Sequence, residues 1–490
     1  MIHPKILSDT EGLARAASFS SKREVRGVAI LALTLLALAG CQARALRPEP
    51  GRGDQAGLYV YLRPLPEVAV RLRFIVAGVA AVDVAGNSVP LKIRMAEIDG
   101  REAGRQRLLA AGVVPAGSYR GLVVTFTAAW LRGEEGEAAL RLPEVPVVVP
   151  MPFVVGRREA SMVEMAYRHE DSVEKGFRFQ PHFFAYTPSR PVVSRLGYAA
   201  SFREDLLAVF DRKTLEVVSV IATGRGPAAI VRDERERRAY VALSQEDAVE
   251  VVDVPSGRVV ARIPLQAGDA PAWLALAQNG LLLSVNRGSN TVSFIDGRSA
   301  VEVSRVRVGY EPVYVLVDRP GRRAYVFNAR SDFLTIIDLA RREVVGSVGT
   351  EAGPFRGSFN RASDRLYVIH RDSPYLTVID ASRLTRVDRL LVGMDASDIH
   401  VDTNTDFVYV GKKGSTVLDV YDPFSLLPVA FIPVPGAPAD MAIDLEENRL
   451  LLAVPEADAV VAVDLINKRL LGVLDVGIDP RSLEVMGARR

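Results

Sequence analysis

The chain has 490 residues, of which 49% are hydrophobic and 24% are charged, as in an ordinary globular protein. Its formal net charge is only +2, so charge gives no reason to expect a nucleic-acid partner. A single cysteine, Cys41, excludes an internal disulfide, a paired-cysteine metal site and covalent haem attachment. The five histidines are scattered, which excludes a metal cluster built from many imidazoles. We therefore expect neither a cofactor nor a metal ion.

The first element is an apolar segment, residues 28–39, which follows Lys22, Arg23 and Arg26. As a helix it would be about 18 Å long, whereas a bilayer core is about 30 Å thick. A basic start, an apolar middle and small residues at the end indicate a secretory signal peptide rather than a membrane span.

The apolar segment ends in Leu-Ala-Gly-Cys, residues 38–41, which closely resembles the lipobox of bacterial lipoproteins. In that family the cysteine thiol receives a diacylglycerol, the chain is cleaved before the cysteine, and the new amine is acylated. The resemblance implies a signal peptide over residues 1–40 and lipidation of Cys41, with palmitate-like chains that hold the protein on a membrane. The alternative is a plain signal peptide followed by a chance cysteine.

The residue after Cys41 is Gln42 rather than Asp. By the family rule of enteric bacteria this implies the outer membrane. We therefore expect a location in the cell envelope, on the periplasmic side of the outer membrane or at the cell surface.

Residues 41–56 are rich in Pro, Gly and charge and predict a flexible tether. From residue 57 to about 190, short apolar or alternating runs are separated by Gly, Pro and charged turns. This spacing predicts an antiparallel β-sandwich domain.

This region resembles a bacterial lipoprotein domain of unknown function over most of its length, most distinctively at residues 108–143, where an apolar stretch leads into a P-x-G-x-Y turn and a long strand. The similarity implies a sandwich related to carbohydrate-binding or transthyretin-like modules and carries no catalytic motif. Three aromatic residues are candidates for stacking on sugar rings, or are ordinary core and edge aromatics: Trp130, Tyr119 and Phe184.

Residues 191–490 form a repeat. A strand-ending aspartate recurs in steps of 42 or 43 residues, at Asp211, Asp253, Asp296, Asp338, Asp380, Asp422 and Asp464. A proline, replaced once by Ala396, follows each aspartate after 16 to 18 residues. Short strands at this period, without a helical pattern, predict a seven-bladed β-propeller. The motif order resembles the YVTN-type propeller repeat of bacterial and archaeal surface and periplasmic proteins. The predicted fold is therefore all-β, with the propeller preceded by an antiparallel β-sandwich domain.

The first repeat, residues 196–223, lacks an inner strand, whereas the last repeat has a spare one at residues 480–487. We expect this strand to complete the first blade and so to close the ring without free edges. The repeated aspartates should hold the amides of the turns that follow them, because an Asp side chain commonly does so.

Each inner strand begins at the recurring proline. Side chains alternate along a strand, so the second and fourth residues after this position should face the axial channel, and the third and fifth should pack between blades. The channel set is aromatic on one side and charged on the other. The candidate ligand-binding residues are Trp273, Tyr314, Arg356, Asp398, His400, Asp440 and Glu484. Alternatively, these polar groups only line a hydrated channel. If a divalent ion were bound, Asp398, His400 and Asp440 would be its ligands.

Loops at one rim carry both charge signs on consecutive blades, which suggests a polar docking rim. The cations are Arg287, Arg330, Arg371, Lys412 and Lys413, and the acids are Asp269, Glu311, Glu351, Asp395 and Asp479.

The sequence contains no catalytic constellation. The leading hypothesis is a lipid-anchored, non-enzymatic envelope protein that presents its rim and channel to a protein, peptide or glycan, with no nucleic-acid partner. One alternative is a lactonase-like propeller hydrolase that uses Arg356, His400 and Glu484. Another is a sensor of a metal ion or metabolite. The fold alone does not choose among them.

Overall fold

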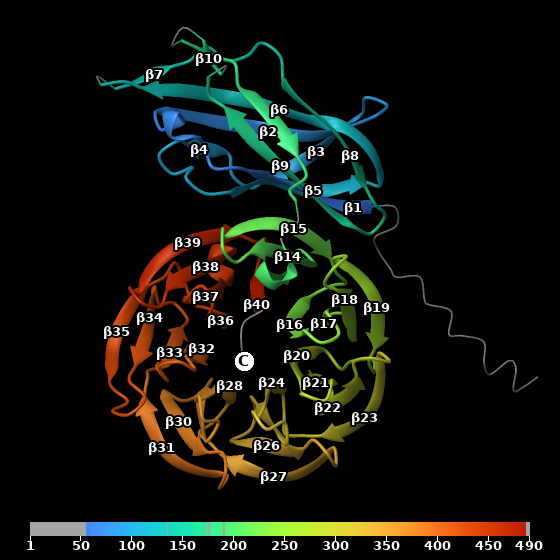
Figure 1. Cartoon of the computed structure of the whole chain (residues 1–490), viewed down its shortest axis with the longest axis vertical. Coiled ribbons are helices and arrows are strands. Elements are labelled where there is room, and N and C mark those ends of the chain that lie inside the picture. The colour runs from blue at the N-terminus through green and yellow to red at the C-terminus, as the bar shows by residue number, and fades with distance from the viewer. Residues whose placement is uncertain (1–54, 135, 171, 175–176, 190–191, 487–490) are drawn as a thin grey trace, which may run out of the picture. The chain divides into compact units, whose positions relative to one another are not determined.

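The computed structural model describes residues 55–134, 136–170, 172–174, 177–189 and 192–486 (Figure 1). The expected signal peptide, Cys41 and nearly all of the tether lie outside these ranges. No helix in the described part of the chain is both long enough and apolar enough to cross a membrane. The fold is all-β, as predicted: a β domain, residues 55–186, precedes a propeller of seven four-stranded blades. Short 3-10 turns lie at η1 (Glu67–Ala69), η2 (Val193–Arg195) and η3 (Pro455–Ala457).

The β domain is built around one sheet of ten strands in the order β12-β9-β1-β5-β3-β2-β6-β7, with β4 beside β2 and β8 beside β6. Its strands are β1 (Gln55–Leu62), β2 (Leu72–Asp83), β3 (Ser88–Ile93), β4 (Glu97–Asp99), β5 (Arg107–Pro115), β6 (Gly117–Arg132), β7 (Glu137–Ala139), β8 (Val147–Val155), β9 (Ala160–Arg168) and β12 (His182–Tyr186). A small hairpin joins β10 (Val173–Glu174) to β11 (Arg178–Phe179).

This sheet is mixed and curled, which refines the predicted antiparallel sandwich. β1 pairs parallel with β9 and antiparallel with β5. β3 bonds to both β2 and β5, so it joins the two halves that would otherwise be separate layers. Register shifts between β2 and the long β6 bend the strands. The sheet therefore curls around a single apolar core that includes Leu58, Phe74 and Leu122.

Seven four-stranded sheets form the propeller, each running from an inner to an outer strand. Blade 1 contains β40 (Pro480–Val485), β13 (Leu196–Ser201), β14 (Leu206–Asp211) and β15 (Glu216–Ala222). Blade 2 contains β16 (Pro227–Asp233), β17 (Arg238–Leu243), β18 (Ala248–Asp253) and β19 (Arg258–Pro264). Blade 3 contains β20 (Pro271–Leu276), β21 (Leu281–Asn286), β22 (Thr291–Asp296) and β23 (Val301–Arg307). Blade 4 contains β24 (Pro312–Val317), β25 (Arg323–Asn328), β26 (Phe333–Asp338) and β27 (Glu343–Gly349).

The remaining blades follow the same plan. Blade 5 contains β28 (Pro354–Phe359), β29 (Arg365–His370), β30 (Tyr375–Asp380) and β31 (Thr385–Leu391). Blade 6 contains β32 (Ala396–Val401), β33 (Val408–Lys412), β34 (Val417–Tyr421) and β35 (Pro428–Pro433). Blade 7 contains β36 (Asp440–Asp444), β37 (Arg449–Val454), β38 (Ala459–Asp464) and β39 (Arg469–Asp475). The second strands, such as β25 and β37, begin with an arginine and are mostly apolar after it, because both of their faces are buried there.

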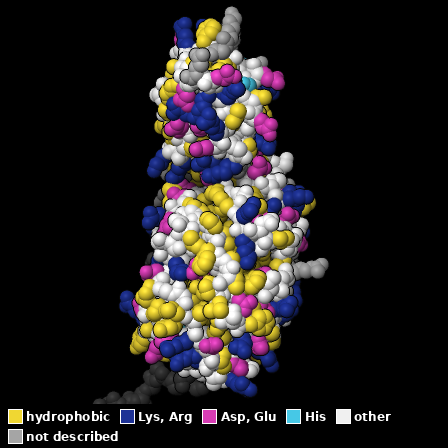
Figure 2. All heavy atoms as spheres, turned by 90° about the vertical axis from the view of Figure 1, so that its left-hand side faces the viewer, with side chains coloured by type: hydrophobic (Ala, Val, Ile, Leu, Met, Phe, Trp, Pro, Cys, Tyr) yellow, Lys and Arg dark blue, Asp and Glu magenta, His cyan; other side chains and the backbone are white. Residues whose placement is uncertain are grey.

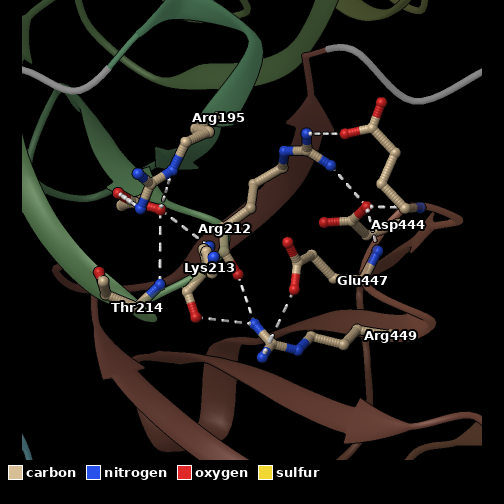
Figure 3. A network of polar contacts seen from close by, with 9 residues as sticks. Arg195, Arg212, Lys213, Thr214, Asp444, Glu447 and Arg449 are labelled. Carbon is tan, nitrogen blue, oxygen red and sulfur yellow. Dashed lines mark hydrogen bonds and ion pairs between the residues drawn. The ribbon is translucent and has the colours of Figure 1, made fainter.

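The closure of the ring is as predicted. β40, from the end of the chain, pairs antiparallel with β13 and completes blade 1. Side chains add a second connection between blades 1 and 7: the buried Arg212 donates hydrogen bonds to Asp444 and Glu446, and Arg449 donates back to the carbonyl of Arg212 (Figure 3). The sheet of blade 1 thus holds the end of the chain, and a polar network around the buried Arg212 joins blade 1 to blade 7.

The repeated aspartates also have the predicted role. Asp338 Oδ1 accepts from the backbone N–H groups of Ala340 and Arg341, both at 2.9 Å. Equivalent hydrogen bonds hold the turns of the other blades, from Asp211, Asp253, Asp296, Asp380, Asp422 and Asp464. These carboxylates are structural, and each belongs to its own turn.

The β domain contacts the outer strand of blade 1. Tyr61 and Met162 share an apolar cluster with Val217 and Val220 of β15. The Gln106 side chain donates to the carbonyl of Val217 at 3.0 Å and accepts from its N–H at 2.8 Å. The outer strand of this blade is therefore covered by another part of the same chain.

Candidate functional site

A repeated irregularity shapes the inner strands that line the axis of the propeller. In blades 2 to 6 the pairing of the inner strand shifts register between its first residue and the residue two positions later. The strand begins with a proline in blades 2 to 5, which has no N–H for the ladder. Such a bulge re-aims the side chains that follow it. The residues after the bulge are those that the sequence placed in the channel.

Arg356 on β28 is the centre of this channel layer. Its guanidinium carbon lies 3.9 Å from the ring centroid of Trp273 and 4.6 Å from that of Tyr314. Its Nη2 donates to the carbonyl of Ala439 at 3.2 Å, and its Nε lies 3.9 Å from Asp398 Oδ1. One buried side chain thus contacts residues from blades 3, 4, 6 and 7, which places it inside the ring.

One nitrogen of Arg356 is left over. Nη1 is buried and has no hydrogen-bond partner. An unpaired buried N–H is costly, because the group has lost water without gaining an acceptor. Stacking on Trp273 and Tyr314 offsets part of this cost through cation–π attraction. The remaining donor is a position at which a ligand oxygen would be stabilised.

Two buried carboxyl groups face this cation. Burial raises the pKa of Asp398 well above its usual range; Arg356 opposes the shift and Asp440 adds to it. Burial also raises the pKa of Asp440 to about 6, again against Arg356. Asp440 accepts from the N–H of Leu483 at 2.8 Å and from that of Met441 at 3.1 Å. The layer therefore offers a fixed donor beside carboxyl groups that accept or donate according to pH.

Tyr314 closes the aromatic side of the layer. Its ring lies 4.8 Å from Trp273 and 5.2 Å from Phe327, measured between centroids. Burial raises the pKa of the Tyr314 phenol, so its hydroxyl stays protonated at neutral pH. Five of the seven candidate residues are thus gathered in one cluster, which we call the Arg356 cluster: Trp273, Tyr314, Arg356, Asp398 and Asp440.

The other two candidates belong to the next layer along the channel. Burial lowers the pKa of His400 to about 4, so its imidazole is neutral at pH 7. Glu484 forms an ion pair with Arg232 at 3.2 Å, and its charge also reaches Asp440. Side chains of this layer, including Ser358 and Ala442, are half-buried, so it is more open to solvent than the layer of Arg356. We take it as the mouth that leads to the Arg356 cluster.

A divalent ion would need several ligands close together. Among the described residues, no group of three His, Cys, Asp or Glu side chains is placed to hold a metal ion, and this includes Asp398, His400 and Asp440.

The aromatic candidates of the β domain do not share one face. Tyr119 is buried, stacks on Phe153 and donates to the carbonyl of Pro115 at 2.7 Å. Trp130 on β6 lies 4.0 Å from the guanidinium of Arg73. Phe184 is exposed on β12, at the other end of the sheet order from β6. Their positions fit core and edge aromatics.

Some of the charged side chains of the rim form ion pairs with one another. Glu311, in the loop before β24, pairs with Arg330 at 2.7 Å and with Arg371 of the next blade at 3.3 Å. These pairs show that the two kinds of loop lie at the same end of the ring, as the sequence predicted.

Two contributors to the site were not foreseen. The carbonyl of Ala439 accepts from Arg356, and the ring of Phe355 lies 5.7 Å from the same guanidinium. Backbone acceptors carry no residue-type signal. Phe355 occupies the bulge, which strict alternation along a strand does not anticipate.

Neither a family model nor a curated protein matches the sequence. Solved structures match the propeller. A functionally unknown protein from Desulfotomaculum acetoxidans has a TM-score of 0.54 and 13% identity, over 60% of this chain and 100% of its own. A candidate 6-phosphogluconolactonase from Bacteroides fragilis has a TM-score of 0.52 and 13% identity, over 60% of this chain and 99% of its own. A protein from Lactobacillus plantarum has a TM-score of 0.52 and 15% identity, over 59% of this chain and 98% of its own. At these identities the likeness shows the propeller fold alone.

Proposed function

We propose that this protein is a lipid-anchored, non-enzymatic binding protein of the cell envelope, and that the Arg356 cluster binds a small polyhydroxylated ligand such as a sugar or the end of a glycan. The observation that carries the proposal is the unpartnered, buried Nη1 of Arg356 beside two carboxyl groups and an aromatic wall. Sugars need donors and acceptors close together, and this cluster supplies both.

A melting-temperature screen tests the binding proposal, because a ligand that binds the native state raises the midpoint. The parent protein is heated with a panel of neutral sugars, sugar acids and divalent metal salts, and the screen is repeated with Tyr314→Phe and Arg356→Met. We expect a neutral sugar to raise the parent midpoint, Tyr314→Phe to reduce the shift, and Arg356→Met to abolish it. Arg389→Met, on the exposed strand β31, is the matched control and should respond like the parent.

The outcomes separate the alternatives. A midpoint raised only by metal salts would support the sensor hypothesis instead. An equal response in the parent and in Arg356→Met would place the ligand elsewhere. Tyr314→Phe removes only a hydroxyl, so it keeps the test usable if Arg356→Met does not fold.

The lipid anchor is tested by mass spectrometry of membrane-extracted protein. We expect Cys41 at the mature N-terminus with a diacylglycerol thioether and an acylated amine. Cys41→Ser should move the protein out of the membrane fraction. An unmodified Cys41 in membrane-extracted protein would overturn this part of the proposal.

A lactonase-type hydrolase is the second candidate, because the pKa of Asp440 lies near 6, where a carboxyl group can act in acid–base catalysis. Lactone hydrolysis that Asp440→Asn abolishes, and that His400→Ala and Glu484→Ala leave unchanged, would favour this function through the Arg356 cluster. If His400→Ala and Glu484→Ala abolished hydrolysis instead, the catalytic groups would be in the layer of His400 and Glu484.

A further inference from the structure

The outer strands of the seven blades can be compared position by position, because they are copies of one repeat. In each outer strand, one residue directly precedes the last inward-facing apolar residue. This residue is Arg or Ser in blades 2 to 5 and apolar in blades 1, 6 and 7: Val220, Arg262, Arg305, Ser347, Arg389, Phe431 and Val473, in blade order. In blade 1 the residue is 5% exposed, because the β domain covers the strand. Blade 6 presents Phe431 at 63% exposure.

A second position shows the same change. Two residues after each repeated aspartate, at the tip of the turn before the outer strand, the blades carry Lys213, Pro255, Arg298, Ala340, Ser382, Phe424 and Ile466. Only blades 6 and 7 have a large apolar residue there. Phe424 is 92% exposed and Ile466 is 74% exposed. Among the blades that the β domain does not cover, both positions are apolar in blades 6 and 7 alone; Phe431 is exposed, whereas Val473 is half-buried.

These residues form one continuous surface. The outer strands β35 and β39 are in contact, and Leu427, Val429, Leu470 and Leu471 are exposed beside them. Figure 2 shows hydrophobic side chains gathered over this side of the propeller. We call the surface the blade 6–7 face, with residues Phe424, Leu427, Val429, Phe431, Ile466, Leu470 and Leu471.

The shape and charge of the face favour a lipid surface. Phe424 and Ile466 are at turn tips and project outward, Phe431 is exposed on β35, and β35 has no charged residue. Cations border it: Arg469 is exposed on β39, and Lys468 precedes it in the same turn. Projecting apolar and aromatic groups enter the boundary between headgroups and acyl chains, while Lys and Arg attract anionic headgroups. A protein partner would need a hollow of matching shape.

We propose that the blade 6–7 face docks on a phospholipid bilayer and holds the ring edge-on to it. Part of this argument rests on the proposed lipidation of Cys41: Gln55 is the fourteenth residue after Cys41, and a chain of this length reaches at most about 50 Å. The bilayer would then always lie within reach. Because the face is on the outer wall of the ring, docking there leaves both ends of the channel in water.

Brominated lipids, which quench nearby tryptophan, test the proposal. The full chain, lipidated at Cys41, is placed in vesicles of phosphatidylethanolamine and phosphatidylglycerol, with and without brominated acyl chains. Trp is introduced as Phe424→Trp or Ile466→Trp, and Ala340→Trp at the equivalent turn of blade 4 is the matched control. The signal of the parent, which includes Trp130 and Trp273, is subtracted. We expect the two reporters to lose about half of their emission while the control loses little.

Each outcome decides something. If the chain floats with the vesicles but the tryptophans at positions 424 and 466 are not quenched, docking of the blade 6–7 face is wrong, while lipid anchoring at Cys41 is still supported. Failure to float would overturn both. Emission at 424 that is blue-shifted, unaffected by brominated lipid and dependent on protein concentration would assign the face to a second copy of the chain and overturn the lipid proposal. The substitutions are at exposed tips, so loss of folding does not obscure the readout.

Discussion

Arg212 and Asp444 are 232 residues apart in the sequence and form a buried ion pair where blade 1 meets blade 7. Arg212 lies just after β14 and Asp444 ends β36, so the pair fastens the two ends of the propeller repeat to each other. The ion pair lies beside the sheet that β40 completes. It is a contact between side chains, whereas the sheet is held by backbone hydrogen bonds. Closure of the ring therefore depends on ionic as well as backbone hydrogen bonds.

Arg212→Met should lower the free energy of unfolding by about 3–5 kcal/mol, because Asp444 would stay buried without its cation. Arg298→Met is the matched control: Arg298 pairs with Glu236 at 2.8 Å but is largely exposed, so its loss should cost about 1 kcal/mol or less. Thermal and urea midpoints measure both. Equal midpoints in the two variants would contradict a closing role for Arg212.

The closing strand itself should be equally sensitive. Leu483 of β40 is 3% exposed and belongs to a core shared by blades 1 and 7 and the β domain. Leu483→Ala should cost about 2–5 kcal/mol through the cavity it leaves. Leu391→Ala, at an exposed end of β31, should change stability by about 0.5 kcal/mol or less. Midpoint shifts of similar size in both variants would show that β40 is not part of the cooperative core.

The aspartates of the repeat should differ in importance according to burial. Asp211 holds Lys213 N–H at 2.8 Å, pairs with Arg195 and is 4% exposed. Asp211→Ala should cost about 1–3 kcal/mol, because buried donors lose their acceptor. Asp338→Ala removes the same turn contacts at a solvent-exposed place and should lower the midpoint less. A reversed order of the two midpoints would contradict this account.

The Arg356 cluster should make stability depend on pH. The pKa of Asp440 is raised to about 6 in the folded state, above that of an unfolded aspartate. The folded state therefore holds this proton more tightly, and the group's contribution to stability is complete at acidic pH and is lost as the pH rises through about 6.

Asp440→Asn removes that contribution. Relative to the parent, the variant should gain melting temperature as the pH rises from about 4 to about 7, the interval in which the folded parent holds the Asp440 proton and the unfolded chain has lost it. Asp388→Asn, at an exposed place on β31, is the control and should follow the parent across the same range. A pH profile of Asp440→Asn that is parallel to the parent profile would show that Asp440 ionises normally.

The period of the sequence was enough to predict the propeller, its closure by the strand that begins at Pro480 and the positions that face the axis, because every blade repeats one pattern of burial. It was not enough to show that Arg356 reaches residues of blades 3, 4, 6 and 7, since that contact depends on the radius of the ring. His400 and Glu484 are the fourth residues after the recurring proline position and the five residues of the Arg356 cluster are the second, so the alternation along the strand already distinguished the two layers. The parallel pairing of β1 with β9 was also hidden, because parallel and antiparallel strands can share the same alternation.

The position of β40 constrains the order of folding. Ser201 of β13 donates to the carbonyl of Val476, 275 residues later in the chain. While the polypeptide emerges from N- to C-terminus, blades 2 to 7 can form from neighbouring segments, but β13 must wait with one edge unpaired. Such an edge is prone to aggregate, and contacts so distant in sequence form slowly. The chain is therefore most vulnerable to aggregation in the interval before its last strand is available, when chaperone protection would matter most.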